Sequence, residues 1–450
     1  MPPTGIGMNP AFQHWLTLPL LSLRGESEED GVTNSVYDGD DHISPEDELF
    51  PEETSPFSIR GHYKNLLTYF ATDSFLRNAG DIPAHKSLIA LLTRVRLSPE
   101  VRLNPNIILY CDMDNEFTVS NYADSQTFDN GWLPPNYNDM YDASAENHVA
   151  GDLFHRLNLH RLYAKLVSGN FTVTAGRQQI RFGSGRLWNP LDILNPVSPT
   201  FVEGAEDQKG TDALKIEYYP GEFTEIALVY APRRVDNEFG FAAFANENTN
   251  ILSRIRTTLG DNDLAVLVGR VARRNLVGGD IAAIVRDGML RGSLLYASPD
   301  DGADYILGSA GYEYNFANGL YCLAEYFYNE NAMNHRGAMS EAYAERMTLG
   351  MNEENYAMLA NQFLTLNRHY VGLALGYDIS PLLRGDFFGI ADIEGRGFFL
   401  SPTVKYNLLQ NLDISLTAMF GWVSEGADHA SDFEAFEEHP LISAVVQWYF

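Results

Sequence analysis

Basic side chains recur at every second position in several segments of this sequence. Arg94 and Arg96, and again Arg254 and Arg256, alternate with aliphatic residues. Successive side chains of a β-strand point to opposite faces, so the two arginines of each pair share a face. Positive charge on a wall with low-dielectric surroundings raises the local concentration of anions. The chemistry that this spacing indicates is recognition of anions rather than bond making.

The same parity argument applies to every expected strand, because lipid cannot solvate charge and the more polar face must point inward. The basic residues expected on the inner wall are Arg94, Arg96, Arg156, Lys215, Arg254, Arg256, Arg270, Arg286, Arg291 and Lys405. The acidic residues expected there are Glu217, Asp280, Glu313, Glu325 and Asp413. Two interpretations stay open: a free basic lining, or arginines that pair with these acids and with loop acids folded into the bore.

Three other patterns are weak candidates for sites. His155 and His160 are an odd number of positions apart, so they take opposite faces of a strand and do not chelate one metal. The segment 183–185 reads Gly-Ser-Gly but lacks the strand–turn–helix context of a nucleophile elbow. Residues 38–41 resemble half of a calcium loop without its last glutamate. We expect no enzyme, metal centre or cofactor, with calcium in the acidic tail or loops as an alternative.

The elements that position the basic residues are strands, because the apolar pattern has a period of two. Every second residue is apolar from Leu412 to Trp422, and again from Ile442 to Phe450. The pattern predicts strands near 57–72, 85–98, 102–119, 153–167, 170–182, 211–219, 223–231, 250–259, 263–273, 279–287, 289–297, 303–315, 319–329, 369–378, 383–392, 397–407, 411–422 and 440–450. An even number of strands, about eighteen, is typical of a closed antiparallel transmembrane β-barrel.

The connections between these strands alternate in length. Short turns such as 168–169, 220–222 and 260–262 alternate with long segments such as 183–210 and 330–368. Bacterial barrels have short periplasmic turns and long extracellular loops, so the alternation supports an all-β barrel. The loop 330–368 is rich in helix-forming residues and is expected to carry a helix.

Composition and charge restrict the class of protein further. The 450 residues have a mean hydropathy of -0.21 and contain no apolar run long enough for a membrane helix. The net charge of -29 disfavours nucleic acid as a partner. Residues 1–56 form an acidic extension, expected to be periplasmic or disordered, and 57–450 form the barrel.

Two segments resemble known families. Ala175–Trp188 resembles the "GRQ…G…R" segment of outer-membrane channels of the alginate-export type, and 189–196 is similar to a related group of envelope barrels. The end of the chain, Gln447–Phe450, resembles the terminal aromatic signature that the barrel-assembly machinery reads. Trp448 and Phe450 are the residues that carry this signature.

The resemblance implies a passive channel in the outer membrane of a Gram-negative cell, with a basic lumen and an in-folded extracellular loop. By analogy, Arg177, Arg181 and Arg186 line its constriction. The alternation of side chains does not fit this placement directly. In a regular strand Arg177 and Arg181 share a face with the apolar Ala175, which is expected to face lipid. Either Gly176 marks a bulge that resets the phase, or the strand ends there.

The leading functional hypothesis is passive diffusion or export of an anionic or polyhydroxylated solute, such as a sugar acid or oligosaccharide. The alternative is a structural barrel that sheaths or docks a periplasmic protein of secretion or electron transfer, with the acidic extension as its docking arm. The remaining expected partners are outer-membrane lipid and the barrel-assembly machinery.

The terminal signature generates a prediction about assembly. Deleting Phe450 is expected to lower the yield in the outer membrane far more than the stability of refolded protein, because the terminal aromatic residue acts as a signal. Membrane yield and the urea midpoint of refolded protein measure the two effects separately. An equal loss in both assays would contradict the signal role.

Overall fold

The computed structural model describes residues 55–71, 87–121, 140, 143–194, 210–232, 235–236, 242–243, 249–300, 302–332, 365–424, 426–427, 429–437 and 440–450. The acidic extension, except for 55–56, and the expected helix in 330–368, except for the ends of that loop, lie outside these residues. No described helix is long and apolar enough to cross a membrane.

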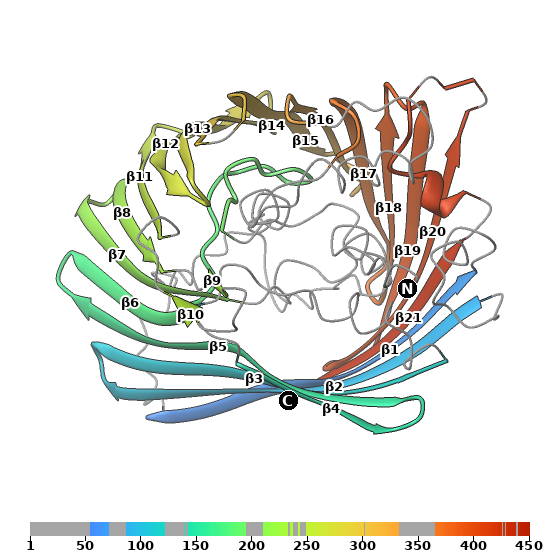
Figure 1. Cartoon of the computed structure of the whole chain (residues 1–450), viewed down its shortest axis with the longest axis horizontal. Coiled ribbons are helices and arrows are strands. Elements are labelled where there is room, and N and C mark those ends of the chain that lie inside the picture. The colour runs from blue at the N-terminus through green and yellow to red at the C-terminus, as the bar shows by residue number, and fades with distance from the viewer. Residues whose placement is uncertain are drawn as a thin grey trace, which may run out of the picture.

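The chain forms a closed antiparallel barrel of 18 strands, which confirms the predicted fold (Figure 1). The strands are β1 (Phe57–Ala71), β2 (Ser87–Asn104), β3 (Ile107–Ser120), β5 (Leu153–Ser168), β6 (Phe171–Gln178), β7 (Thr211–Gly221), β8 (Thr224–Ala231), β11 (Asn250–Leu259), β12 (Asn262–Val271), β13 (Arg274–Val285), β14 (Gly288–Pro299), β15 (Tyr305–Asn315), β16 (Tyr321–Asn329), β17 (His369–Ser380), β18 (Leu383–Asp392), β19 (Gly397–Leu409), β20 (Leu412–Val423) and β21 (Leu441–Tyr449). Each predicted strand has its counterpart: 250–259 and 383–392 match the observed bounds, and the others have shifted ends.

The remaining elements are short. β4 (Ser144–Ala150) pairs with the first half of β5, beyond the end of β6. β9 (Val235–Asp236) and β10 (Ala242–Ala243) form a separate small hairpin, and η4 (Glu434–Phe436) is a single helical turn. The sequence pattern did not predict them, since such short segments contain too few residues to establish a period.

The last strand pairs with the first, as the sequence predicts. β1 and β21 are bonded from His62 opposite Tyr449 to Phe70 opposite Leu441. Phe450 extends the ladder, because its N–H donates to the carbonyl of Gly61 at 3.0 Å and its carbonyl accepts from Gly61 at 2.9 Å. Lipid offers no hydrogen-bond partner, so this seam removes the edge that an open sheet would expose.

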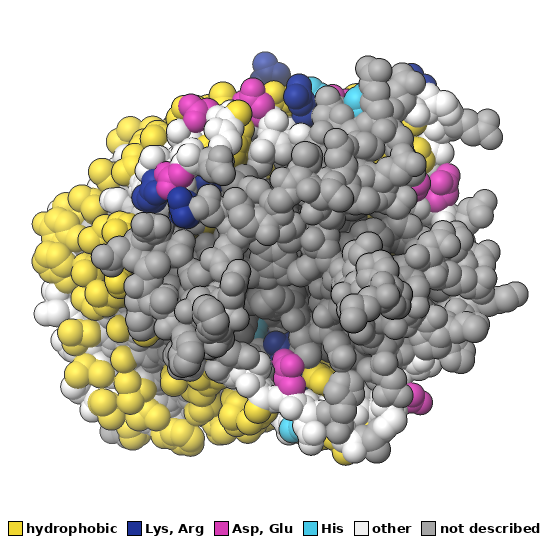
Figure 2. Space-filling view, in the orientation of Figure 1, with side chains coloured by type: hydrophobic (Ala, Val, Ile, Leu, Met, Phe, Trp, Pro, Cys, Tyr) yellow, Lys and Arg dark blue, Asp and Glu magenta, His cyan; other side chains and the backbone are white. Residues whose placement is uncertain are grey.

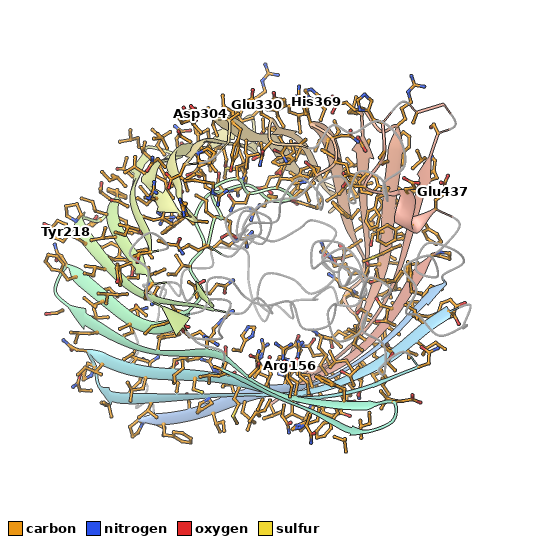
Figure 3. The ribbon with its side chains drawn as sticks, viewed as in Figure 1. Arg156, Tyr218, Asp304, Glu330, His369 and Glu437 are labelled. Atoms are coloured by element: carbon orange, nitrogen blue, oxygen red, sulfur yellow. The ribbon has the colours of Figure 1, made fainter. Side chains whose placement is uncertain are left out.

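The two faces of the wall differ as the alternation requires. Large apolar side chains such as Val266, Leu294 and Leu416 are more than half exposed on the outside. Figure 2 shows such side chains gathered over the outer flank of the barrel. Figure 3 shows Arg156 on the inside of the ring and Tyr218 on the outside. A closed barrel with an apolar outer belt is the structure of an outer-membrane protein.

Apolar residues also line part of the inner face, near the end of the barrel with the long connections. Two connections pack against them. Residues 180–194 contribute Ile180, Phe182 and Leu191 to one cluster with inward residues of β7–β15. Residues 430–436 contribute Phe433 and Phe436 to a second cluster with β1, β2 and β17–β21. The interior is therefore partly filled by the chain's own loops.

A buried carboxyl group links the connection 430–436 to the end of the connection that precedes β17. The Asp432 carboxyl accepts the backbone N–H of Leu366 at 3.1 Å and the hydroxyl of Tyr370. Nearby, Asn367 donates to Asp392 at 2.8 Å and to the carbonyl of Ala430 at 2.7 Å. Burial, and then the negative charge of Asp392, raise the pKa of the Asp432 carboxyl to about 8.

This raised pKa predicts a pH-dependent loop packing. In the folded protein the pKa of Asp432 lies well above the ordinary value of about 4. The protonated carboxyl therefore stabilises the loop packing fully below about pH 4, and this stabilisation is lost as the pH rises through about 8. We expect the Leu366 amide to lose hydrogen-exchange protection, corrected for intrinsic rates, between pH 6 and pH 9. Asp432→Asn should make the protection independent of pH. Equal protection of the unmodified protein at both values would contradict this.

Candidate functional site

Residues 179–194, here called the inner loop, enter the barrel directly after β6. Figure 1 shows this segment as a green coil inside the ring. Glu325 of β16 fixes its position, because the carboxylate accepts the backbone N–H groups of Arg186 at 3.1 Å, Leu187 at 3.2 Å and Trp188 at 2.7 Å. Three converging N–H donors satisfy a carboxylate without a cation. Glu325 is thus a positioning residue, and it is 2% exposed.

The tip of the inner loop packs into the wall through Trp188. Its ring stacks on Phe327 with centroids 5.4 Å apart and lies 6.3 Å from the ring of Tyr370. Gly372 of β17 makes room for the loop, since a Cβ there would come within 2.4 Å of Leu187 and 2.9 Å of Trp188. The close approach therefore requires glycine at this position of the strand.

Two arginines converge on one carboxylate where the inner loop meets the wall. Glu313 of β15 accepts from Arg291 of β14 at 2.8 Å and from the Nε of Arg186 in the inner loop at 3.1 Å. The hydroxyl of Tyr321 donates to the same carboxylate at 2.9 Å. This arrangement, called the arginine pair, carries one more positive than negative charge.

Elsewhere on the inner face, seven of the expected basic residues have acidic partners. The pairs are Arg94–Glu116 (2.6 Å), Arg96–Asp114 (2.6 Å), Arg156–Glu146 (3.6 Å), Lys215–Glu217 (2.9 Å), Arg254–Glu225 (2.7 Å), Arg256–Asp263 (2.9 Å) and Lys405–Asp386 (2.9 Å). Of the two interpretations of the wall, the described residues support the paired one. Positive and negative side chains therefore alternate along the wall, and their electrostatic potentials largely cancel a few ångströms away from each pair.

The pairs differ in how far they reach into the bore. The side chains of Arg94, Arg96 and Arg254 are at most 8% exposed, whereas that of Arg256 is 26% exposed. Arg254 is also covered by the Phe182 ring of the inner loop, whose centroid lies 4.7 Å from its guanidinium carbon. The charges of the deeper pairs are therefore withdrawn from a passing solute.

Of the three arginines that the resemblance places at the constriction, Arg186 and Arg181 lie in the inner loop. Arg181 is 3.5 Å from Asp192 of the same segment and keeps a fifth of its side chain exposed. Arg186 belongs to the arginine pair. The inner loop thus contains both residues, and the question of parity raised for Arg181 does not arise, because β6 ends at Gln178.

Arg177 does not line the bore. β6 continues past Gly176, which has a φ of +122°, to Gln178 without a register shift. Arg177 therefore lies opposite Leu162, on the register of the outward residues, and is 2% exposed. Its guanidinium donates to Asp212 at 2.8 Å and to the carbonyl of Leu159 at 3.2 Å. Arg177 and Asp212 thus form a buried ion pair that links β6 to β7.

Two further expectations about the inner wall are wrong. Arg270 shares its parity with the exposed Val266 and Val268, and it bonds to Asp300 at the outer rim. Arg286 lies in the turn between β13 and β14 with a φ of +50° and is exposed. Arg270 lies within β12 at the same parity as those two valines, so its face was assigned wrongly, whereas Arg286 lies beyond the end of β13, which was predicted too long.

Several acidic partners were not among the expected wall residues. Asp112, Asp114 and Glu116 of β3 are buried on the inner face and alternate strictly, so the same parity argument could have found them. Glu225 lies at the start of β8, where the sequence shows too little alternation to assign a face. Glu146 comes from β4, which was not predicted.

The two histidines face opposite ways, as their spacing predicts. His155 is bonded to Asn115 on the outer face, and His160 lies 3.7 Å from Asp114 on the inner face. Within the described ranges, no three histidine, cysteine, aspartate or glutamate side chains are grouped as metal ligands.

No family model and no curated protein matches this sequence, whereas solved structures do. OccAB4 of Acinetobacter baumannii has a TM-score of 0.53 at 10% identity, over 89% of this chain and 100% of that one. OccK2 of Pseudomonas aeruginosa, in complex with glucuronate, has a TM-score of 0.51 at 7% identity, over 88% and 98%. A BenF-like porin of Pseudomonas fluorescens has a TM-score of 0.53 at 8% identity, over 88% and 98%.

The chain has the fold of an outer-membrane porin. The likeness supports the porin class and does not single out the alginate-export family. At these identities it concerns the fold alone, so the function of this porin-fold chain depends on its own residues.

Glu325 generates a prediction about the inner loop of this porin fold. Glu325→Gln keeps the side-chain size but directs an NH2 group at backbone N–H donors, leaving donors unsatisfied at a cost of about 1–3 kcal/mol. Hydrogen exchange of a peptide covering Trp188 should become faster. Glu217→Gln, which removes an inner-face acid on β7 away from the loop, is the matched control. Unchanged exchange in Glu325→Gln would show that packing alone holds the loop.

Proposed function

We propose that the chain is a passive outer-membrane channel for small anionic solutes of the sugar-acid type. The observation that carries this proposal is the arginine pair. Arg186 and Arg291 share the single carboxylate of Glu313, where the inner loop meets the wall. Their side chains are 13% and 15% exposed, so neither is fully withdrawn from solvent.

The other nearby acid does not cancel this charge. Glu325 is buried, and its carboxylate accepts N–H groups of the inner loop backbone. The positive ends of three backbone N–H dipoles point at this carboxylate, and they offset part of its negative potential at the bore. The site therefore keeps a local excess of positive charge within a chain whose net charge is -29.

Most of the wall is neutral over short distances, so selectivity is concentrated at the inner loop. Within this proposal Arg181, Arg186, Lys215, Arg256 and Arg291 line the path, and the deeper Arg94, Arg96 and Arg254 stabilise the wall through their partners. A sequence of paired charges lets a solute exchange contacts without a deep binding minimum, as passive conduction requires.

The comparisons agree with this proposal without establishing it. The OccK2 structure, which has a similar fold, is in complex with glucuronate, a small sugar acid. The segment that resembles alginate-export channels forms the inner loop here, so that resemblance also points to a path for an acidic sugar. The size of the solute, from a single sugar acid to an oligosaccharide, stays part of the proposal.

Charge removal at the arginine pair tests the proposal. A unit charge about 7 Å from a permeating ion contributes about 0.6 kcal/mol at the dielectric of water, or about threefold in local concentration. Arg186→Gln and Arg291→Gln should each lower the anion-to-cation permeability ratio by about that factor. The reversal potential of purified protein in a planar bilayer, under a salt gradient, measures it.

Arg270→Gln is the matched control, because Arg270 bonds to Asp300 at the outer rim and is expected to leave the reversal potential unchanged. A barrel that sheaths or docks a periplasmic protein would conduct only when emptied of it or not at all, so the outcome that counts against the proposal is purified protein that conducts no current. That result, or a cation preference that the arginine substitutions do not alter, would overturn the proposal.

A further inference from the structure

The outer face of four neighbouring strands carries polar side chains where lipid requires apolar ones. They are Asn65 of β1, Thr93 of β2, Asn115 of β3 and His155 of β5, here called the polar band. Asn65 lies opposite Thr93, and Val95 beside it lies opposite Asn115. Along the chain these residues alternate with buried inward residues, so they belong to the lipid-facing parity.

Hydrogen bonds connect the members of the polar band. The Thr93 hydroxyl donates to the Asn65 Oδ1 at 2.8 Å, and the Asn65 amide donates to the Tyr63 hydroxyl at 2.8 Å. The His155 Nε2 is 2.7 Å from the Asn115 Oδ1. These bonds leave the Asn115 amide nitrogen and the second ring nitrogen of His155 with capacity for further bonds.

Apolar side chains lie on both sides of the polar band along the strands. On β1, Ile59 and Leu67 are 51% and 47% exposed below and above Asn65. On β3, Met113 and Val119 are 37% and 49% exposed below and above Asn115. The band is thus enclosed within the apolar belt, where acyl chains offer neither donors nor acceptors.

The opposite wall shows what the belt looks like without such a band. Between the strand ends, the outward residues of β12–β14 include Val266, Val268, Val277, Ile281, Leu290 and Leu294, each at least 38% exposed, and the polar Arg270 and Asn275 lie at the rim. β1, β2, β3 and β5 lie side by side across the ring from β13–β16 (Figure 1). The polar groups therefore mark one side of the barrel.

We propose that the polar band is the contact through which two copies of this chain associate side by side in the membrane. Its residues are neutral, and asparagine, threonine and histidine each both donate and accept. A two-fold contact places the same patch on both partners, so it requires a surface that complements itself. The polar band meets this requirement, whereas a charged partner would need fixed charges that the band lacks.

Crosslinking of single-cysteine proteins in membranes tests this proposal, which is independent of conduction. Val95→Cys, in a chain with Cys111→Ser and Cys322→Ser, puts one thiol beside Asn115 on the outer face. A bifunctional maleimide should yield a product of twice the monomer mass. The control keeps only the native Cys322 of β16, which faces lipid across the ring, and should yield background levels.

A second variant separates the polar band from random collision. Asn65→Leu, Thr93→Val and Asn115→Leu, added to the Val95→Cys protein, make the face more apolar and should leave barrel assembly intact. The crosslinked fraction should fall by about tenfold, as expected for the loss of several membrane hydrogen bonds of about 0.6 kcal/mol each. Val266→Leu, Val277→Leu and Leu294→Val on the far wall should have no effect.

Three results would overturn the proposal. They are equal crosslinking through Val95→Cys and Cys322, a Val95→Cys product of another mass, and a crosslinked fraction that the band substitutions do not change. The second result would indicate a different membrane protein as the partner.

Discussion

The structure depends on one constraint: lipid gives a backbone N–H or carbonyl no hydrogen-bond partner. Every strand must therefore be bonded on both sides, and the pairing of β1 with β21 follows from that need. Closure fixes two faces for each strand, because side chains alternate. Across the apolar belt, charged residues are favoured on the inside, since lipid does not solvate charge. The position of the arginine pair, like that of the inner loop that it contacts, follows from the closed ring.

This constraint explains how much of the fold the sequence could predict. From Leu412 to Trp422 the alternation is strict because β20 separates lipid from the bore along its whole length. β6 was predicted too long, because Ile180 and Phe182 continue the apolar count after the strand has ended at Gln178. Those residues are buried by inner-face packing rather than by lipid. Periodicity records which side chains avoid water and does not distinguish these two environments.

The candidate site was less predictable, since it depends on contacts between distant segments. Parity placed Arg254 and Arg291 correctly on the inner face. It could not show that Glu225 lies beside one and Glu313 beside the other. It also missed that Glu325, an inward acid like the others, bonds to backbone N–H groups rather than to an arginine. Such distinctions arise from the path of the inner loop, whose course depends on where glycines such as Gly372 admit it.

Pairing of charges and the in-folded loop act together on the bore. Inside a barrel an isolated arginine would be partly dehydrated, so a nearby carboxylate lowers the cost of placing it there. The same pairing removes long-range attraction for anions, which leaves selectivity to positions where two arginines meet one carboxylate. The inner loop creates such a position, because it adds Arg186 to a carboxylate that already binds Arg291. The inner loop thus narrows the path and changes the charge of the wall at the same place. The size limit on a solute and the preference for the sign of its charge therefore depend on the same segment.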